Sequence, residues 1–182
     1  DEGTGLLGLP DVCLQAVVLA LREPRDVAAL AATCRQLQQV CLSAPLRLRV
    51  QGSPDFAGKA EGELLGVSRR FKNTVELELL DANVTEDTVQ QTMRALPELR
   101  WLHIKSCNKI SGRLGQEIAG AAPEGCPLGV TVQRCFRMTW TLLRDLLQLS
   151  FEPGSSLRCA AVSHLDLDAQ KVGHDALVRV CG

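Results

Sequence analysis

One stretch of the sequence decides the fold: Leu99-Arg100-Trp101-Leu102-His103-Ile104-Lys105-Ser106-Cys107-Asn108-Lys109-Ile110-Ser111. Apolar Leu102 and Ile104 alternate with polar neighbours, which predicts a β-strand with one buried face. Cys107 follows where the chain must turn inside the core, and a small side chain that can meet buried backbone groups fits such a turn. The stretch therefore predicts a short buried strand that leads into a turn.

The same strand pattern occurs on both sides of this stretch. The pairs Leu77-x-Leu79, Leu102-x-Ile104, Val130-x-Val132 and Leu165-x-Leu167 are spaced by 25 residues (77 to 102), 28 (102 to 130) and 35 (130 to 165). Each pair is followed by apolar residues at helical spacing, so a strand-plus-helix unit repeats. Because no such unit can bury its own core, the units are expected to stack into a parallel sheet backed by helices.

The first fifty residues have a different periodicity: from Leu9 to Val40 their apolar residues recur at every third or fourth position. This spacing predicts a small helical unit. Residues 51–73 are rich in glycine, with Pro54 among them, a composition that favours turns. We therefore expect a helical domain over 1–50, a connector over 51–73 and about four strand-plus-helix repeats over 74–182, the last one incomplete.

The composition restricts the partners. The 182 residues are 46% hydrophobic, which is enough for a core, and the net charge is −1. Such a balance gives no field that attracts nucleic acid or an anionic membrane surface. The longest apolar run, Val17 to Leu21, is far shorter than the roughly 18 residues of a membrane span. Neither nucleic acid nor a membrane is an expected partner.

The eight cysteines contain no Cys-x-x-Cys pair. We expect reduced thiols packed in a core, no metal site, no cofactor and a cytoplasmic or nuclear location. His103 and His164 fall in different repeats, about 10 Å apart, which is too far for a shared metal ion. No nucleophile and base pair or phosphate-binding loop stands out, so no catalytic residue is assigned.

In the first segment Leu9-Pro10 opens a helix with Leu14, Val18 and Leu21 along it, and Asp26-Val27 after a proline turn, Leu30 and Cys34-Arg35 follow. With these residues the segment resembles the F-box. Residues 99–111 resemble a cysteine-containing leucine-rich repeat, and the two resemblances cover residues 6–48 and 74–182. They imply an α+β to α/β fold: a small all-helical F-box followed by a short leucine-rich-repeat solenoid, with parallel strands on the concave face and helices on the convex face.

The resemblance also implies a function. In this family the F-box docks on the adaptor Skp1, and through it on a cullin, while the repeats present a protein target to the E3 ubiquitin ligase. The chain would then be the non-catalytic substrate-recognition subunit of an Skp1–cullin–F-box ligase, in the ubiquitin-like conjugation pathway. The alternative is a structural scaffold subunit of a large assembly that keeps the fold for docking. Leu37 and Pro45-Leu46 stand where the family often has a tryptophan and another apolar anchor, which keeps this alternative open.

Two sets of binding residues follow from the resemblance. Contact with Skp1 is expected from Leu9, Pro10, Leu14, Val18, Leu21, Val27 and Leu30, although these residues could equally form the helical unit's own core. A target is expected to meet the polar strand positions Glu76, Glu78, Asp81, Trp101, His103, Lys105, Ser106, Thr131, Gln133, Arg134, His164, Asp166 and Asp168. For Trp101 the alternative is packing against a neighbouring strand or the connector, and for the charged residues it is an ordinary solvated face.

Overall fold

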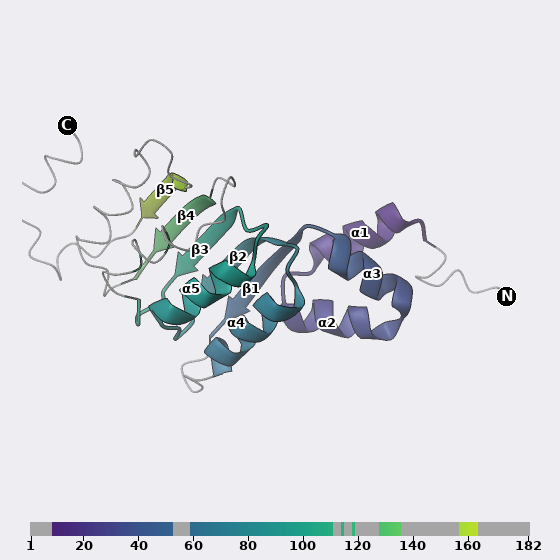
Figure 1. The fold of residues 1–182 in the computed structure, drawn as a ribbon, viewed down its shortest axis with the longest axis horizontal. Helices are drawn as coiled ribbons and strands as arrows, with labels where there is room; N and C mark the ends of the chain where they lie inside the picture. The colour runs from purple at the N-terminus through teal and green to yellow at the C-terminus, as the bar shows by residue number, and fades with distance from the viewer. Residues whose placement is uncertain are drawn as a thin grey trace, which may run out of the picture.

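The computed structural model describes residues 9–52, 59–110, 114, 118, 128–135 and 157–163. These residues form an α/β fold in which N-terminal helices precede a parallel sheet whose strands are interleaved with helices (Figure 1). The elements are α1 (Asp11–Ala20), α2 (Pro24–Thr33), α3 (Arg35–Ser43), β1 (Leu46–Gln51), α4 (Lys59–Arg70), β2 (Thr74–Leu80), α5 (Glu86–Ala95), β3 (Trp101–Lys105), β4 (Leu128–Gln133) and β5 (Leu157–Ser163). No helix among the described residues has the length and apolar character of a membrane span.

The helical unit α1–α3 follows from its local sequence signals. Pro10 precedes the first residue of α1, and Pro24 is the first residue of α2, where its missing N–H is not needed. The Cys34 thiol caps α3 by accepting a hydrogen bond from the backbone N–H of Leu37, at 3.4 Å. The helices bury one face each, so the expected helical N-terminus is confirmed.

The described strands form a sheet in the order β1-β2-β3-β4-β5, and every neighbouring pair is parallel. The inward positions are in register: Leu77 pairs with Leu102, which pairs with Val130. The strands predicted around residues 75–79, 102–104 and 130–132 are therefore confirmed as neighbours in one parallel sheet.

The fourth predicted strand is placed differently. Val130 pairs with Ala160 in β5, whereas the sequence aligned Val130 with Leu165. Residues 165–167 lie outside the described part of the chain. The expected alignment was wrong because β5 contains Cys159-Ala160-Ala161, small residues that give little hydrophobic alternation, whereas Leu165 and Leu167 imitate the pattern of the earlier strands.

Two further elements lie where none was expected. β1 lies at the end of the predicted helical domain and forms the first strand of the sheet. Its buried residues Leu46, Leu48 and Val50 alternate with more exposed ones, as in a strand with one buried face. The predicted connector contains α4, a helix of 12 residues. Its glycines Gly62 and Gly66 are four apart and share an exposed face, while Leu64 and other apolar residues of α4 are buried. This burial outweighs the cost of glycine in a helix, about 1 kcal/mol each.

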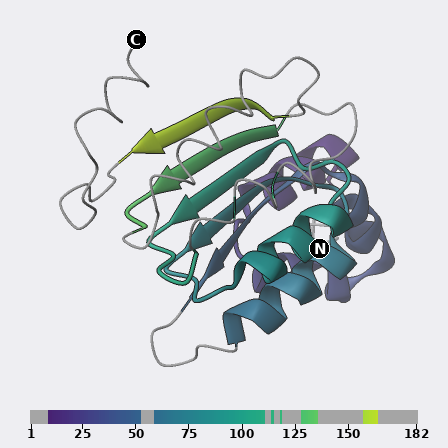
Figure 2. The ribbon, with the colours of Figure 1, turned by 60° about the vertical axis from the view of Figure 1, so that its left-hand side comes forward.

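The fold consists of the sheet, a layer of helices on one of its faces, and the helical unit at one edge. Helices α4 and α5 lie side by side against one face of the sheet (Figure 2), while α1–α3 lie at the β1 end (Figure 1). A continuous cluster of buried apolar side chains extends from Leu14 in α1 to Cys135 after β4. The helical unit and the sheet therefore share one core.

The same turn follows three strands. Asp81, Ser106 and Arg134 occupy equivalent positions after β2, β3 and β4, and each has a positive φ, of 50°, 54° and 53°. The Asp81 N–H donates to the Lys105 carbonyl at 3.0 Å, and the Ser106 N–H donates to the Gln133 carbonyl at 2.9 Å. These turn residues continue the hydrogen bonding of the sheet beyond the strand ends.

A buried small residue follows each of these turns: Ala82, Cys107 and Cys135. The Cys107 thiol donates to the carbonyls of Lys105 (3.3 Å) and Leu79 (3.7 Å), and the Cys135 thiol donates to that of Gln133 (3.4 Å). Burial, with a smaller effect of the neighbouring Cys135, raises the pKa of Cys107 to about 12. The Cys107 side chain is therefore a neutral thiol that satisfies strand carbonyls inside the core.

Candidate functional site

The face of the sheet turned away from α4 and α5 carries polar side chains in straight rows, and we call it the open face. Register brings Arg47, Glu76, Trp101 and Gly129 into one row and Arg49, Glu78, His103 and Thr131 into the next. Gln51, Leu80, Lys105 and Gln133 form a third row. Side chains from four separate strands thus form one surface.

Glu76 is surrounded by basic groups. Its Oε1 lies 3.3 Å from Nη1 of Arg22 and 3.6 Å from Nε2 of His103, and its Oε2 lies 3.5 Å from Nε of Arg47. Arg22 belongs to the segment between α1 and α2, so this carboxylate links the helical unit to the sheet. The cations it holds remain about half exposed.

Glu78 is the more buried of the two carboxylates, with 9% of its side chain exposed. It accepts hydrogen bonds from Nε of Arg49 at 2.7 Å and from Nζ of Lys105 at 2.8 Å. Burial alone would raise the pKa of Glu78, but the hydrogen bonds and charges of Lys105 and Arg49 outweigh it and lower the pKa. Glu78 is therefore an ionised group that fixes one cation on each side.

Trp101 is the large apolar group of the open face. It is 44% exposed, and its ring stacks parallel to that of His103 with a centroid distance of 6.1 Å. A Cβ built on its register partner Gly129 would collide with the indole. The ring therefore lies over the Gly129 backbone and still offers surface to a partner.

The predicted target-binding residues divide into three groups. Glu76, Glu78, Trp101, His103, Lys105, Thr131 and Gln133 come together on the open face. Asp81, Ser106 and Arg134 do not lie in the strands, because they occupy the positive-φ turns beyond the strand ends. His164, Asp166 and Asp168 lie outside the described residues.

Sequence reasoning missed three arginines of this surface. Arg47 and Arg49 were assigned to the helical domain, although the alternation Arg47-Leu48-Arg49-Val50 is itself a strand signal. Arg22 comes from outside the sheet and contacts Glu76, 54 residues away in sequence. No local pattern could have indicated that contact.

The predicted Skp1-contact residues are mostly internal. Leu14, Val18 and Val27 are fully buried, Leu21 and Leu30 are partly buried against the core, and Leu9 and Pro10 are exposed. The buried residues have no surface to offer, because the 3.6-residue period put them on the inner faces of their helices. They form the helical unit's own core, the alternative that the sequence had left open.

A different apolar surface lies on α1. Val12 and Leu19 of α1 are 75% and 36% exposed, and their spacing, with exposed Ala16 between them, places these three residues along one side of the helix. Leu9, which is 40% exposed, precedes the N-cap Pro10 and so lies just before the helix. Leu42 of α3 is also exposed. Helix α1 thus presents apolar side chains on its outer face as well as on its inner face. We call Val12, Ala16 and Leu19 the α1 stripe.

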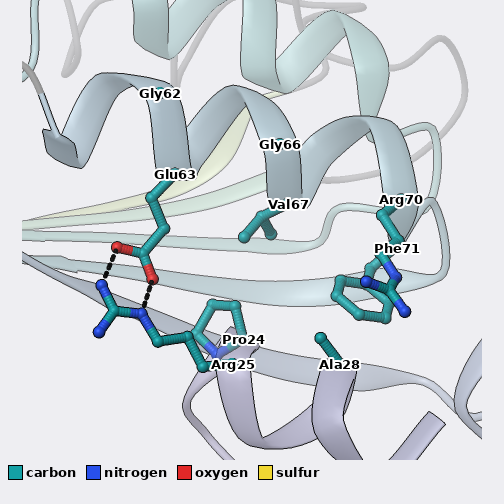
Figure 3. Close-up of a pocket in the computed structure, with 9 residues that line it drawn as sticks. All are labelled: Pro24, Arg25, Ala28, Gly62, Glu63, Gly66, Val67, Arg70 and Phe71. Atoms are coloured by element: carbon teal, nitrogen blue, oxygen red, sulfur yellow. Dashed lines mark hydrogen bonds and ion pairs between the residues drawn. The ribbon is translucent and has the colours of Figure 1, made fainter. Parts of the chain in front are cut away.

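A groove of about 590 Å³ separates α2 from α4 (Figure 3). Val67 and Phe71 contribute apolar surface, and at one end Arg25 pairs with Glu63, with Nε 3.5 Å from Oε1. Gly62 and Gly66 lie on the α4 wall, and a Cβ added to either would meet nothing within 4 Å. Nothing in the described residues requires glycine at these two positions.

Replacing both Gly62 and Gly66 with alanine is expected to raise the free energy of unfolding by about 1–2 kcal/mol, because alanine loses less backbone freedom in a helix than glycine does. Denaturant titration measures the change. Gly129→Ala is the matched control, since its Cβ would strike Trp101 and no stabilisation is expected. An unchanged or lowered denaturant midpoint for the double variant would contradict the conclusion that these glycines face open space.

Among the described residues, no three His, Cys, Asp or Glu side chains are grouped as metal ligands would be, and Cys13, Cys34, Cys41, Cys107 and Cys135 are free thiols. Comparison of the sequence with protein-family models and with curated proteins gave no match. A functional assignment therefore depends on the fold and on the two surfaces just described.

Proposed function

We propose that the chain is an F-box and leucine-rich-repeat protein that serves as the non-catalytic substrate receptor of an Skp1–cullin–F-box ubiquitin ligase. The helical unit binds Skp1, and the open face binds a protein target. Free thiols in the described core fit a cytoplasmic or nuclear location.

The observation that carries the adaptor contact is the α1 stripe. Residues of a helix that pack on the core normally alternate with polar residues on the outer face, yet the outer face of α1 carries Val12, Ala16 and Leu19. An exposed apolar surface next to a complete core is typical of a protein-binding site. It supports docking through the outer side of α1, in place of the buried leucine and valine side chains.

The recurring turn supports the repeat assignment. Strands β2, β3 and β4 are each followed by a residue with positive φ and then by buried Ala82, Cys107 or Cys135. The thiols donate to strand carbonyls, which gives a physical reason for a cysteine at this point of a repeat. Equivalent backbone geometry in successive strand units is what a stacked repeat requires.

The proposal is tested by expressing the full chain with Skp1 and measuring whether the two co-purify. We expect a stable complex, and we expect Val12→Asp with Leu19→Asp to reduce co-purified Skp1 at least tenfold, because both charges would be desolvated in the interface. The control Gln91→Asp adds one negative charge at an exposed residue of α5 and should leave binding unchanged.

Circular dichroism must show that the α1 variant remains folded. Failure of the wild-type chain to bind Skp1 would refute the proposal. If Skp1 binds, the abundance of other captured proteins is compared with and without a proteasome inhibitor. A rise on inhibition is expected for ligase targets, whereas a stoichiometric complex of constant abundance would favour the scaffold function instead.

A further inference from the structure

Among the described residues, the open face combines an excess of cations with one large apolar ring, that of Trp101. In its described part, Arg22, Arg47, Arg49 and Lys105 contact only two carboxylates, those of Glu76 and Glu78. The chain as a whole has a net charge of −1, so this cationic excess is local. A local excess of this kind attracts an acidic partner.

The glutamates hold these cations in position without using all their donors. An arginine side chain has five N–H donors, yet Arg22 and Arg49 each donate to their glutamate through one nitrogen, and Nε of Arg47 lies 3.5 Å from Glu76. The Arg22 and Arg47 side chains stay about half exposed. Guanidinium groups that are already oriented lose less conformational entropy when they bind another carboxylate.

We infer that the open face binds an acidic segment of the target protein, with target carboxylates over Arg22, Arg47 and Arg49 and a target apolar side chain on Trp101. This inference rests on the proposed use of the open face for targets and names the chemistry of that target. Arg47 and Trp101 lie in one row, two strands apart, which is about 10 Å. An extended chain covers that distance in about three residues, which sets the spacing between the acidic and apolar residues.

The arrangement favours a protein segment over a nucleic acid. Glu76 lies between Arg47 and Trp101, and Glu78 lies between Arg49 and His103. A continuous phosphate backbone that crossed these rows would pass over both carboxylates, whereas a protein can place uncharged residues there. The alternation of charge across the strands therefore matches a segment with a few well-spaced acidic residues.

The test uses the purified full chain and fluorescein-labelled synthetic peptides of ten residues. One peptide has two adjacent glutamates three positions before a leucine, and its counterpart has glutamines in their place. We expect at least tenfold tighter binding of the acidic peptide at low salt, weakening as salt is raised. Arg47→Gln and Trp101→Ala should each lower its affinity at least fivefold, while Arg94→Gln on α5 should not change it.

Two results would overturn the inference: equal binding of both peptides, or tighter binding of a labelled single-stranded oligonucleotide than of the acidic peptide. Because the measurement needs no adaptor, it is independent of the Skp1 experiment. If Skp1 binds through α1 and captured targets are lost on Trp101→Ala, but the acidic peptide is not preferred, then only the target chemistry is wrong and the receptor function stands.

Discussion

Replacing Asn73 with leucine is expected to lower the free energy of unfolding by about 2–3 kcal/mol. Nδ2 of buried Asn73 donates to the Cys41 carbonyl at 3.0 Å and to the Ala44 carbonyl, both at the end of α3. Leucine would leave these buried acceptors without that donor, at a cost of about 1–3 kcal/mol each. Oδ1 of Asn73 has no partner among the described residues, so its removal offsets part of the loss.

Denaturant unfolding measures this change, and hydrogen exchange localises it. Since Asn73 precedes β2 and its partners end α3, we expect faster exchange in α3 than in β2 and β3 of the variant. Asn108→Leu is the matched control, because Asn108 is exposed, and its effect should stay within about 0.5 kcal/mol. An equal decrease in the free energy of unfolding for the two variants would mean that the Asn73 side chain does not join the helices to the sheet.

The parallel sheet was predictable because its strands have the simplest sequence signal. Leu77-x-Leu79 and Leu102-x-Ile104 alternate cleanly, and the structure pairs them residue by residue. The signal failed where it was weak or ambiguous. Ala160 of β5 is small, and Leu48 of β1 was interpreted as part of the helical domain because helices precede it. Periodicity detects large apolar residues in alternation, not strands as such.

Helix α4 was missed for a related reason. Its glycines suggested turns, but Gly62 and Gly66 face open space and cost only local backbone entropy. Leu64 and Val67 are buried on the other side, so the tertiary contacts determine the conformation. A propensity argument counts glycines, whereas the fold depends on which face of the helix carries them.

The two proposed binding surfaces were predictable only in part. Alternation correctly placed Glu76, Glu78 and Trp101 on one face, but it gave no indication of Arg22, which reaches that face from the helical unit. For the adaptor, the F-box resemblance drew attention to Leu14 and Val18, which are buried. Exposed Val12 belongs to no such pattern, because an exposed residue need not follow the periodicity of the protein's own core.

Glu78→Gln is expected to lower the free energy of unfolding at pH 7 by about 1–3 kcal/mol. The substitution keeps the shape of the side chain but removes the negative charge between Arg49 and Lys105, so the two cations would repel each other across a largely buried amide. Loss of one partner from a fully buried ion pair costs about 3–5 kcal/mol, and the value here is smaller because both cations are partly solvated.

The dependence on pH separates this electrostatic effect from a packing defect. The folded protein lowers the pKa of Glu78, so the unfolded chain binds its proton more readily, and the ionised carboxylate stabilises the fold fully above the ordinary glutamate pKa of about 4.3. That stabilisation is lost as the pH falls through the folded pKa, where protonated glutamate comes to resemble glutamine. Denaturant midpoints of wild type and Glu78→Gln should therefore differ most near pH 7 and converge in acid.

The control Glu76→Gln removes a more exposed carboxylate with ion pairs of 3.3–3.6 Å, so its effect on the free energy of unfolding at pH 7 should stay below about 1 kcal/mol. A difference between wild type and Glu78→Gln that stayed constant down to pH 3 would assign the loss to packing and not to charge.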